Sequence, residues 1–158
     1  MNYGEIILND IANGDGIRLS LFVSGCNHQC KGCFQPETWN PNYGKPFTGE
    51  TLHFIIDELS KSQYDGITFL GGDPLYPNNR QTVADIILCI KDKLPNKTIW
   101  LYTGDLYENL VKESKSDKNL DYILKTIDVL VDGPFIEELK DIRLQFRGSS
   151  NQKIYYLK

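Results

Sequence analysis

The spacing of apolar residues along the chain changes repeatedly from every second residue to every third or fourth residue. This pattern predicts strands that alternate with helices. The segment Ile17 to Val23 has apolar residues at every second position, with Phe22 also apolar, as expected for a mostly buried strand. Further strands are predicted at 66–70, 97–102 and 127–131, and the tail 143–157 is expected to contain one or two more.

Helices are predicted between these strands. The segment Thr51 to Lys61 places its apolar residues on one helical face, with Thr48 as the expected N-cap. Helical segments are also predicted at 79–94, at 106–125 with a break near 114–118, and, as a short helix, at 135–140. Strands joined by helical crossovers of this length predict an α/β fold with a mostly parallel sheet and flanking helices.

One long segment, Ser24 to Phe47, has no clear periodicity and contains three clustered cysteines. It follows the carboxyl end of the first predicted strand, where α/β folds build their sites. The next three strands run into Gly71-Gly72-Asp73-Pro74, Thr103-Gly104-Asp105 and Asp132-Gly133-Pro134. Each of these is an ordinary turn sequence when taken alone. Their convergence on one edge beside the cysteine segment predicts a ligand pocket.

Composition limits the possible functions. The 158 residues are 41% hydrophobic and carry a net charge of −4. We therefore expect a single domain spanning residues 1–158, and no binding to nucleic acid or to an anionic membrane surface. No apolar run approaches the ~20 residues of a bilayer span, and the first residues lack the pattern of a secretory signal, so we expect none. We expect a cytoplasmic protein in which clustered cysteines bind metal rather than form disulfides.

The clustered cysteines are Cys26, Cys30 and Cys33, with C-x3-C-x2-C spacing. An iron–sulfur cube that only carries electrons is usually held by four thiolates. Three thiolates leave one iron open to a small molecule. The alternatives are a zinc site completed by His28 or Cys89, or free structural thiols. Zinc sites usually pair C-x2-C units or add histidines at set intervals, and no second pair is present.

The flanking residues are Gly14-Asp15-Gly16-Ile17-Arg18, Phe22 to Gly25 before Cys26, and Thr38-Trp39 after the last cysteine. Together with the cysteines, this arrangement resembles the radical S-adenosylmethionine enzymes, and more narrowly the activating enzymes that install a glycyl radical in a partner protein. Gly32-Cys33, the short chain and the segment Arg147 to Gln152 are most similar to the subgroup that acts on anaerobic ribonucleoside-triphosphate reductase. The resemblance implies an incomplete β/α barrel.

The resemblance also implies a mechanism. Cys26, Cys30 and Cys33 would hold one [4Fe–4S] cluster, and S-adenosylmethionine would bind its open iron. An electron from an external low-potential donor would cleave S-adenosylmethionine to methionine and a 5′-deoxyadenosyl radical. That radical would take a hydrogen atom from a glycine of the reductase large subunit. No catalytic residue is expected beyond the ligands of the cluster and the cofactor.

Six residues are expected to bind S-adenosylmethionine by the same resemblance: Gly71, Gly72, Asp73, Phe34, Thr103 and Gly104. The backbone of Gly71-Gly72 would lie against the methionyl group, since glycine permits close approach. Asp73 stands where the family usually has the longer glutamate. Many family members have an aromatic residue beside adenine at the position of Gly32. Phe34 or Trp39 is expected to replace it.

Several other residues have simpler interpretations. His28 is expected to be a polar loop residue, His53 a surface residue, and Cys89 a small hydrophobic residue. Arg143 and Arg147 are either partners of a carboxylate or surface charges. Two alternative functions stay open within the enzyme class: a pyruvate formate-lyase-type activase and a small radical enzyme of deazapurine synthesis. Outside that class, the alternative is a non-catalytic zinc or iron–sulfur module.

Overall fold

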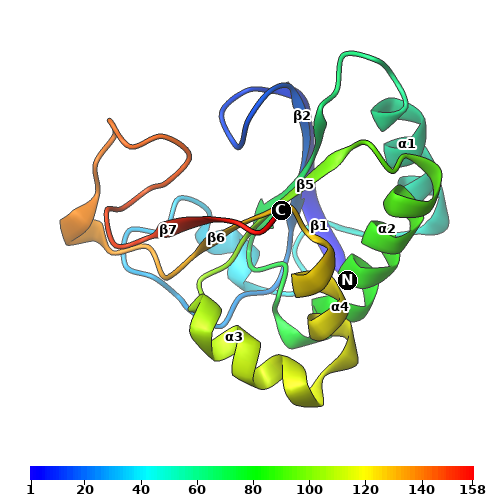
Figure 1. Ribbon diagram of the computed structural model, residues 1–158. Coiled ribbons are helices and arrows are strands. Elements are labelled where there is room, and N and C mark those ends of the chain that lie inside the picture. The colour runs from blue at the N-terminus through cyan, green and yellow to red at the C-terminus, as the bar shows by residue number, and fades with distance from the viewer.

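The computed structural model describes residues 1–158 and contains one seven-stranded sheet, in the order β3-β1-β2-β4-β5-β6-β7 (Figure 1). The strands are β1 (Asn2–Asp10), β2 (Arg18–Val23), β3 (Lys45–Pro46), β4 (Gly66–Gly71), β5 (Thr98–Tyr102), β6 (Val129–Asp132) and β7 (Lys153–Tyr156). The four neighbours β2, β4, β5 and β6 run parallel, whereas β1, β3 and β7 pair antiparallel. The expected α/β fold with a mostly parallel central sheet is confirmed.

The helices are α1 (Gly49–Leu59), α2 (Arg80–Lys93), α3 (Tyr107–Glu113) and α4 (Lys118–Thr126). Thr48 caps α1 as expected, and its side chain accepts a hydrogen bond from the Thr51 amide. The expected break separates α3 from α4 at the 3-10 turn Ser114–Ser116. The short helix expected at 135–140 is reduced to the 3-10 turn Glu137–Leu139. None of the helices combines the length and apolar composition needed to cross a bilayer.

The first strand, β1, was not predicted. It pairs with β2 in an antiparallel register that shifts between Tyr3 and Glu5 and again between Ile7 and Asp10. Such irregularities insert residues into the ladder and interrupt the alternation of inward and outward side chains. The short partner β3 lies inside the segment that showed no periodicity. The sheet is therefore wider than the pattern predicted, and both edges are formed by antiparallel strands.

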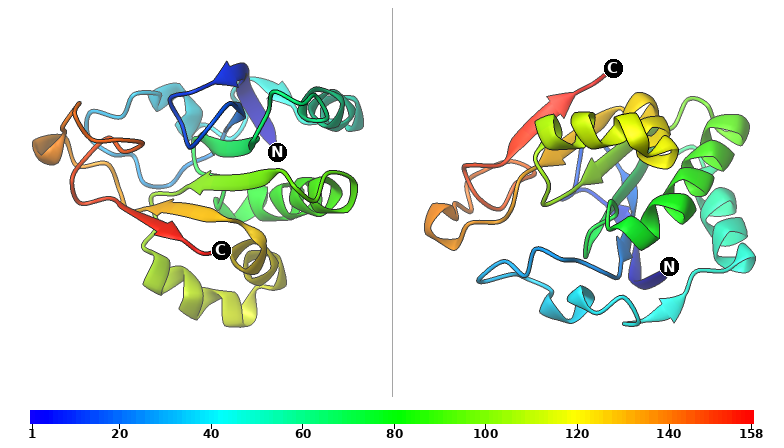
Figure 2. Two further views of the ribbon diagram at one scale, coloured as in Figure 1. Left: turned by 45° about the horizontal axis from the view of Figure 1, so that its top comes forward. Right: turned by 90° about the horizontal axis from the view of Figure 1, so that it is seen from below.

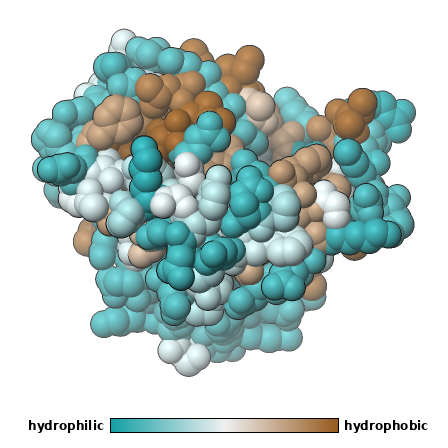
Figure 3. All heavy atoms as spheres, turned by 180° about the vertical axis from the view of Figure 1, so that it is seen from behind, coloured by the Kyte–Doolittle hydropathy of each residue, from teal (hydrophilic) through white to brown (hydrophobic).

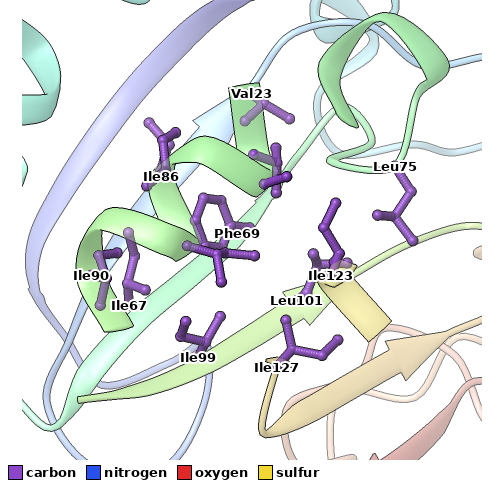
Figure 4. Close-up of a cluster of buried hydrophobic side chains, with 14 of the residues drawn as sticks. Val23, Ile67, Phe69, Leu75, Ile86, Ile90, Ile99, Leu101, Ile123 and Ile127 are labelled. Carbon is purple, nitrogen blue, oxygen red and sulfur yellow. The ribbon is translucent and has the colours of Figure 1, made fainter. Parts of the chain in front are cut away.

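One face of the sheet packs against α1, α2 and α4 and forms the hydrophobic core (Figures 2 and 4). Alternate strand residues such as Leu21, Phe69 and Leu101 point to this face and are fully buried. They meet the apolar faces of the helices, including Ile55 of α1 and Ile86 of α2. Burial of these side chains is the main contribution to the stability of the fold.

The opposite face is more polar. It includes Arg18, the first residue of β2, which is fully buried. The Arg18 guanidinium donates to Thr68 Oγ1 at 2.7 Å and to the Ile67 carbonyl at 2.8 Å, and it lies 5.6 Å from the centre of the Trp100 ring. Burial lowers the pKa of Arg18 to about 10. Hydrogen-bond acceptors and nearby carboxylates together stabilise this buried cation, and this face is not a purely apolar core.

Two irregular segments lie at the carboxyl end of the parallel strands. One is the segment 24–47, and the other is the β6–β7 loop, residues 133–152. Both views in Figure 2 place them at the same end of the sheet. A backbone bridge between Lys140 and Ser149 ties the β6–β7 loop to itself. The end of the sheet predicted to hold a site is thus enclosed by segments from both halves of the chain.

Candidate metal and cofactor site

A cavity of about 560 Å³ opens between these two segments and the carboxyl end of the sheet. Its floor includes Phe22, Leu70 and Tyr102, which lie near the ends of β2, β4 and β5 on the face that does not carry the helices. Eight of the nine residues predicted for the site line this cavity: Cys26, Cys30, Cys33, Phe34, Gly71, Gly72, Thr103 and Gly104. The ninth, Asp73, lies behind the cavity wall.

The three cysteines lie in the cluster loop, residues 26–33, and all are free and partly buried. The amide of Cys26 donates to the Trp39 carbonyl at 3.3 Å, and the amide of Cys33 donates to the Cys30 carbonyl at 3.1 Å. Burial raises the pKa of the Cys26 thiol to about 11, while the amides of His28 and Gln29 act in the opposite direction. A bound metal would replace the proton of this thiol.

Asp73 is 2% exposed, and its carboxylate oxygens accept hydrogen bonds from other groups of the protein. Its Oδ2 accepts from Thr103 Oγ1 and from the Gly104 amide, both at 3.0 Å, while its Oδ1 accepts from the Leu75 amide at 2.8 Å. His28 Nε2 is 2.9 Å from the same Oδ2. Asp73 therefore joins the ends of β4 and β5, and does not present its carboxylate to a ligand.

His28 was expected to be a polar loop residue, and its bond to Asp73 is a part of the site that the sequence did not reveal. The hydrogen bond to Asp73 is the main cause of the raised pKa of His28. Asp105 Oδ1 lies 3.5 Å from the same Nε2 atom, and burial raises the pKa of Asp105. A position between two cluster cysteines was the only available signal.

His28, Asp73 and Asp105 place possible metal ligands within 4.8 Å of one another. Asp73 Oδ2, however, is already the acceptor or partner of three groups. A carboxylate oxygen so occupied has little capacity left for a cation. The three residues therefore form a hydrogen-bonded cluster next to the cysteines.

Gly71 and Gly72 are required by the close packing of the backbone. Gly71 has φ +107, and a Cβ there would lie 2.7 Å from the backbone of Val23. A Cβ on Gly72 would lie 2.7 Å from the Gly25 carbonyl oxygen and 2.9 Å from that of Thr38. The sequence-based reason, room for a ligand, is therefore not the steric reason found here. Larger side chains would first displace the base of the cluster loop.

The aromatic residues of the cavity come from both irregular segments. Phe34 is 66% exposed and lies 5.1 Å from the Phe135 ring, centre to centre. Trp39 also lines the cavity. At Gly32, where φ is +77, a Cβ would lie 3.0 Å from the Glu137 carboxyl group. The positive φ at this position favours glycine, and the Glu137 side chain of the β6–β7 loop lies beside it.

Two cavity residues carry buried polar atoms that have no partner, namely the Tyr102 hydroxyl and Arg147 Nε. Burial raises the pKa of Tyr102, so its hydroxyl stays protonated and able to donate. Arg147 donates through Nη1 to the Gln152 carbonyl at 3.0 Å. Unpaired buried polar atoms are uncommon in proteins. Their presence at one cavity fits a polar ligand.

Three further residues lie away from the cavity. Arg143 pairs with Asp141 at the surface, through two contacts of 3.0 Å. His53 is exposed, as expected, and lies 3.2 Å from Asp57. Cys89 is partly buried on α2 and does not line the cavity. The structure thus separates Arg147, which lines the cavity, from Arg143, which does not.

Residues 12–155 match the protein family described as the 4Fe-4S single cluster domain. The chain belongs to this family of [4Fe–4S] proteins, and the family match favours an iron–sulfur cluster over zinc.

Among curated proteins, the chain is similar to several that carry the name anaerobic ribonucleoside-triphosphate reductase-activating protein. The protein of Enterobacteria phage T4 is 41% identical over 155 residues, or 98% of this chain and 94% of the relative. The protein of Escherichia coli K12 is 40% identical over 160 residues and covers both chains fully. The protein of Vibrio cholerae is 41% identical and covers 98% of this chain and 97% of the relative. The resemblance expected from the cysteine region is confirmed.

Proposed function

We propose that this protein activates an anaerobic ribonucleoside-triphosphate reductase by generating a glycyl radical on its large subunit. The observation that carries the proposal is the meeting of three cysteines and two strand-end glycine segments at one cavity. The names of relatives that cover 98–100% of the chain support the activation of this reductase.

Cys26, Cys30 and Cys33 would hold the cluster, because they are the only cysteines at the cavity. A cluster held by three protein thiolates would keep one iron without a protein ligand, and that iron would be available to S-adenosylmethionine. When bound, the cluster and S-adenosylmethionine supply a 5′-deoxyadenosyl radical after one-electron reduction by an external donor. The protein contributes binding, orientation and exclusion of water.

The cavity has the features that binding of S-adenosylmethionine requires. Its volume of about 560 Å³ lies within the range of about 300–1,000 Å³ that is usual for small-molecule pockets. The Arg147 guanidinium and the Tyr102 hydroxyl supply polar groups with unused bonding capacity. Phe34 and Trp39 supply aromatic surface for adenine. The strand-end segments Gly71-Gly72 and Thr103-Gly104 supply backbone groups at the wall.

The sheet would correspond to the incomplete β/α barrel of radical S-adenosylmethionine enzymes, formed by a single domain of residues 1–158. The helices of the core cover one face, and the other face carries the buried Arg18 and leads to the cavity. The edge strands β3 and β7 do not pair with each other. An open side of this kind admits a segment of a protein substrate.

The β6–β7 loop would contact the reductase. Ile142 in this loop is 92% exposed and Leu139 is 41% exposed, while Phe34 across the cavity is 66% exposed. Figure 3 shows hydrophobic atoms at the outer end of this projecting part of the molecule. Exposed apolar side chains beside a reaction cavity are typical of an interaction surface. The reductase glycine loop would enter the cavity next to them and exclude water.

The test combines anaerobically reconstituted protein, S-adenosylmethionine, a strong reductant and the reductase. Electron paramagnetic resonance should detect a glycyl radical on the reductase only when all components are present. Replacing the radical-bearing glycine of the reductase by alanine should remove the signal but not the association of the two proteins. A radical formed on pyruvate formate-lyase and never on the reductase would favour the competing activase. A colourless protein that retains zinc would contradict both assignments.

A further inference from the structure

The cluster loop has few attachments to the rest of the protein. Among residues 27–32, only His28 and Lys31 form side-chain bonds or ion pairs with other parts of the chain. Lys31 is 81% exposed, and its ammonium lies 3.6 Å from Glu137 and 3.9 Å from Glu138. Exposed pairs of this kind contribute little to stability. His28, with 24% of its side chain exposed, is therefore the main side-chain attachment of this loop.

The partner of His28 is itself firmly held. Asp73 is 2% exposed and accepts hydrogen bonds from the Leu75 and Gly104 amides and the Thr103 hydroxyl. The His28 imidazole fits beside Gly104 only because glycine has no side chain: a Cβ there would lie 2.7 Å from His28 Cγ. The pair thus connects the cluster loop to the ends of two central strands.

We infer that His28 is a positioning residue for the iron–sulfur cluster, acting through its hydrogen bond to Asp73. The inference rests on the proposed ligand set, since Cys26 and Cys30 each lie two positions from His28. Groups that orient metal ligands from outside the coordination sphere affect both metal retention and electronic properties.

Two substitutions of His28 by residues of similar size distinguish the effect of its hydrogen bond from the effect of its volume. His28→Gln retains an amide that can donate to Asp73, and His28→Leu has no donor. His53→Leu is the matched control, because His53 also pairs with a carboxylate but lies on the exposed surface of α1. After anaerobic reconstitution, a chelator is added and the decay of the visible absorbance of the cluster is followed.

We expect His28→Leu to lose its cluster roughly 10- to 100-fold faster than the unmodified protein, the usual range for such orienting groups. His28→Gln should stay within a few-fold of the unmodified protein, and His53→Leu should be unchanged. The reduction potential, measured by spectroscopic titration, should shift in His28→Leu but not in His53→Leu. A role confined to the stability of the apoprotein would leave the potential unchanged.

Asp73→Asn tests whether His28 acts through Asp73. In that background, adding His28→Leu should change cluster lifetime by less than about twofold, since interacting residues are non-additive. Independent, multiplying effects would overturn the inference. A His28→Gln protein as labile as His28→Leu would also overturn it, as would unchanged lifetime and potential in His28→Leu.

Neither readout uses S-adenosylmethionine or the reductase. Failure of this inference is therefore distinguishable from failure of the proposed function. An unmodified protein that assembles no cluster would contradict the proposed function. A stable cluster that does not respond to His28→Leu would contradict only the positioning role.

Discussion

Gly104→Ala should remove the His28–Asp73 hydrogen bond while leaving both partners in the chain. The new Cβ would lie 2.7 Å from His28 Cγ and 2.8 Å from Nε2, against an ordinary van der Waals contact of 3.4–4 Å. The imidazole therefore has to move by about 1 Å or rotate away. From its present 2.9 Å, the contact to Asp73 would then pass the limit of a hydrogen bond.

The expected loss is modest. A hydrogen bond to a charged group contributes about 1.5–3 kcal/mol, and the lower end applies because His28 is partly exposed and Thr103 still donates to Asp73. Replacing glycine by alanine also stabilises by up to about 1 kcal/mol through the unfolded chain. The net change in the free energy of unfolding should be near 1 kcal/mol destabilising. For a chain of this size, Tm should fall by about 2–4 °C.

The assay is urea unfolding of the metal-free protein, followed by circular dichroism, at about pH 6 and about pH 9. The folded state raises the pKa of His28 above its unfolded value. The charged pair therefore stabilises fully below the unfolded pKa, and this contribution is lost as pH rises through the folded pKa. The deficit of Gly104→Ala should be larger at the lower pH.

Gly49→Ala is the control, because a Cβ there meets nothing within 4 Å at the start of α1. It should be neutral or slightly stabilising at both pH values. If Gly104→Ala matched the unmodified protein at both pH values, or if its deficit grew with pH, the reasoning about the His28–Asp73 pair would be refuted.

Three further outcomes are expected. Cys30→Ala should abolish cluster assembly, whereas Cys89→Ala should retain iron near the level of the unmodified protein; equal losses in an iron assay would contradict the ligand assignment. Ile142→Asp should weaken association with the reductase by about tenfold or more in a binding titration, with cluster content unchanged, because a charge replaces a desolvated apolar contact. Gly72→Ala should destabilise the fold by about 1–3 kcal/mol in thermal unfolding through its contacts with backbone oxygens; an unchanged Tm would contradict this.

Much of the fold was predictable because its main elements are strongly periodic. The central strands and α1, α2 and α4 bury one regular face each, and their sequences record that burial directly. In β1, the two register shifts interrupt the alternation of apolar residues, so its sequence lacks the pattern of a strand. The antiparallel pairing of β7 with β6 was not predictable either, since strand direction depends on the path of the preceding loop.

The candidate site was predictable where it is local in sequence. The three cysteines and the strand-end glycines each lie within a short segment of the sequence, and these segments line one cavity. The His28–Asp73 contact joins residues 45 positions apart, and neither residue has a pattern that identifies the other. Arg147 lines the cavity, whereas Arg143 pairs with Asp141 at the surface. Both lie in the β6–β7 loop, and the sequence does not show which of them the loop turns toward the cavity. Such information appears only when distant segments are packed together.

The enclosure of the cavity by the β6–β7 loop has a consequence for the order of events during biosynthesis. The cluster loop leaves the ribosome early, but the opposite wall, with Phe146, Arg147 and Gln152, is made more than 100 residues later. Until residues 146–152 are made, the chain lacks this wall of the cavity. Transfer of a preformed cluster to the finished chain would expose it to water and oxidants for the shortest time. A chain cut before residue 146 would still contain all three cysteines but would lack the wall that shields them.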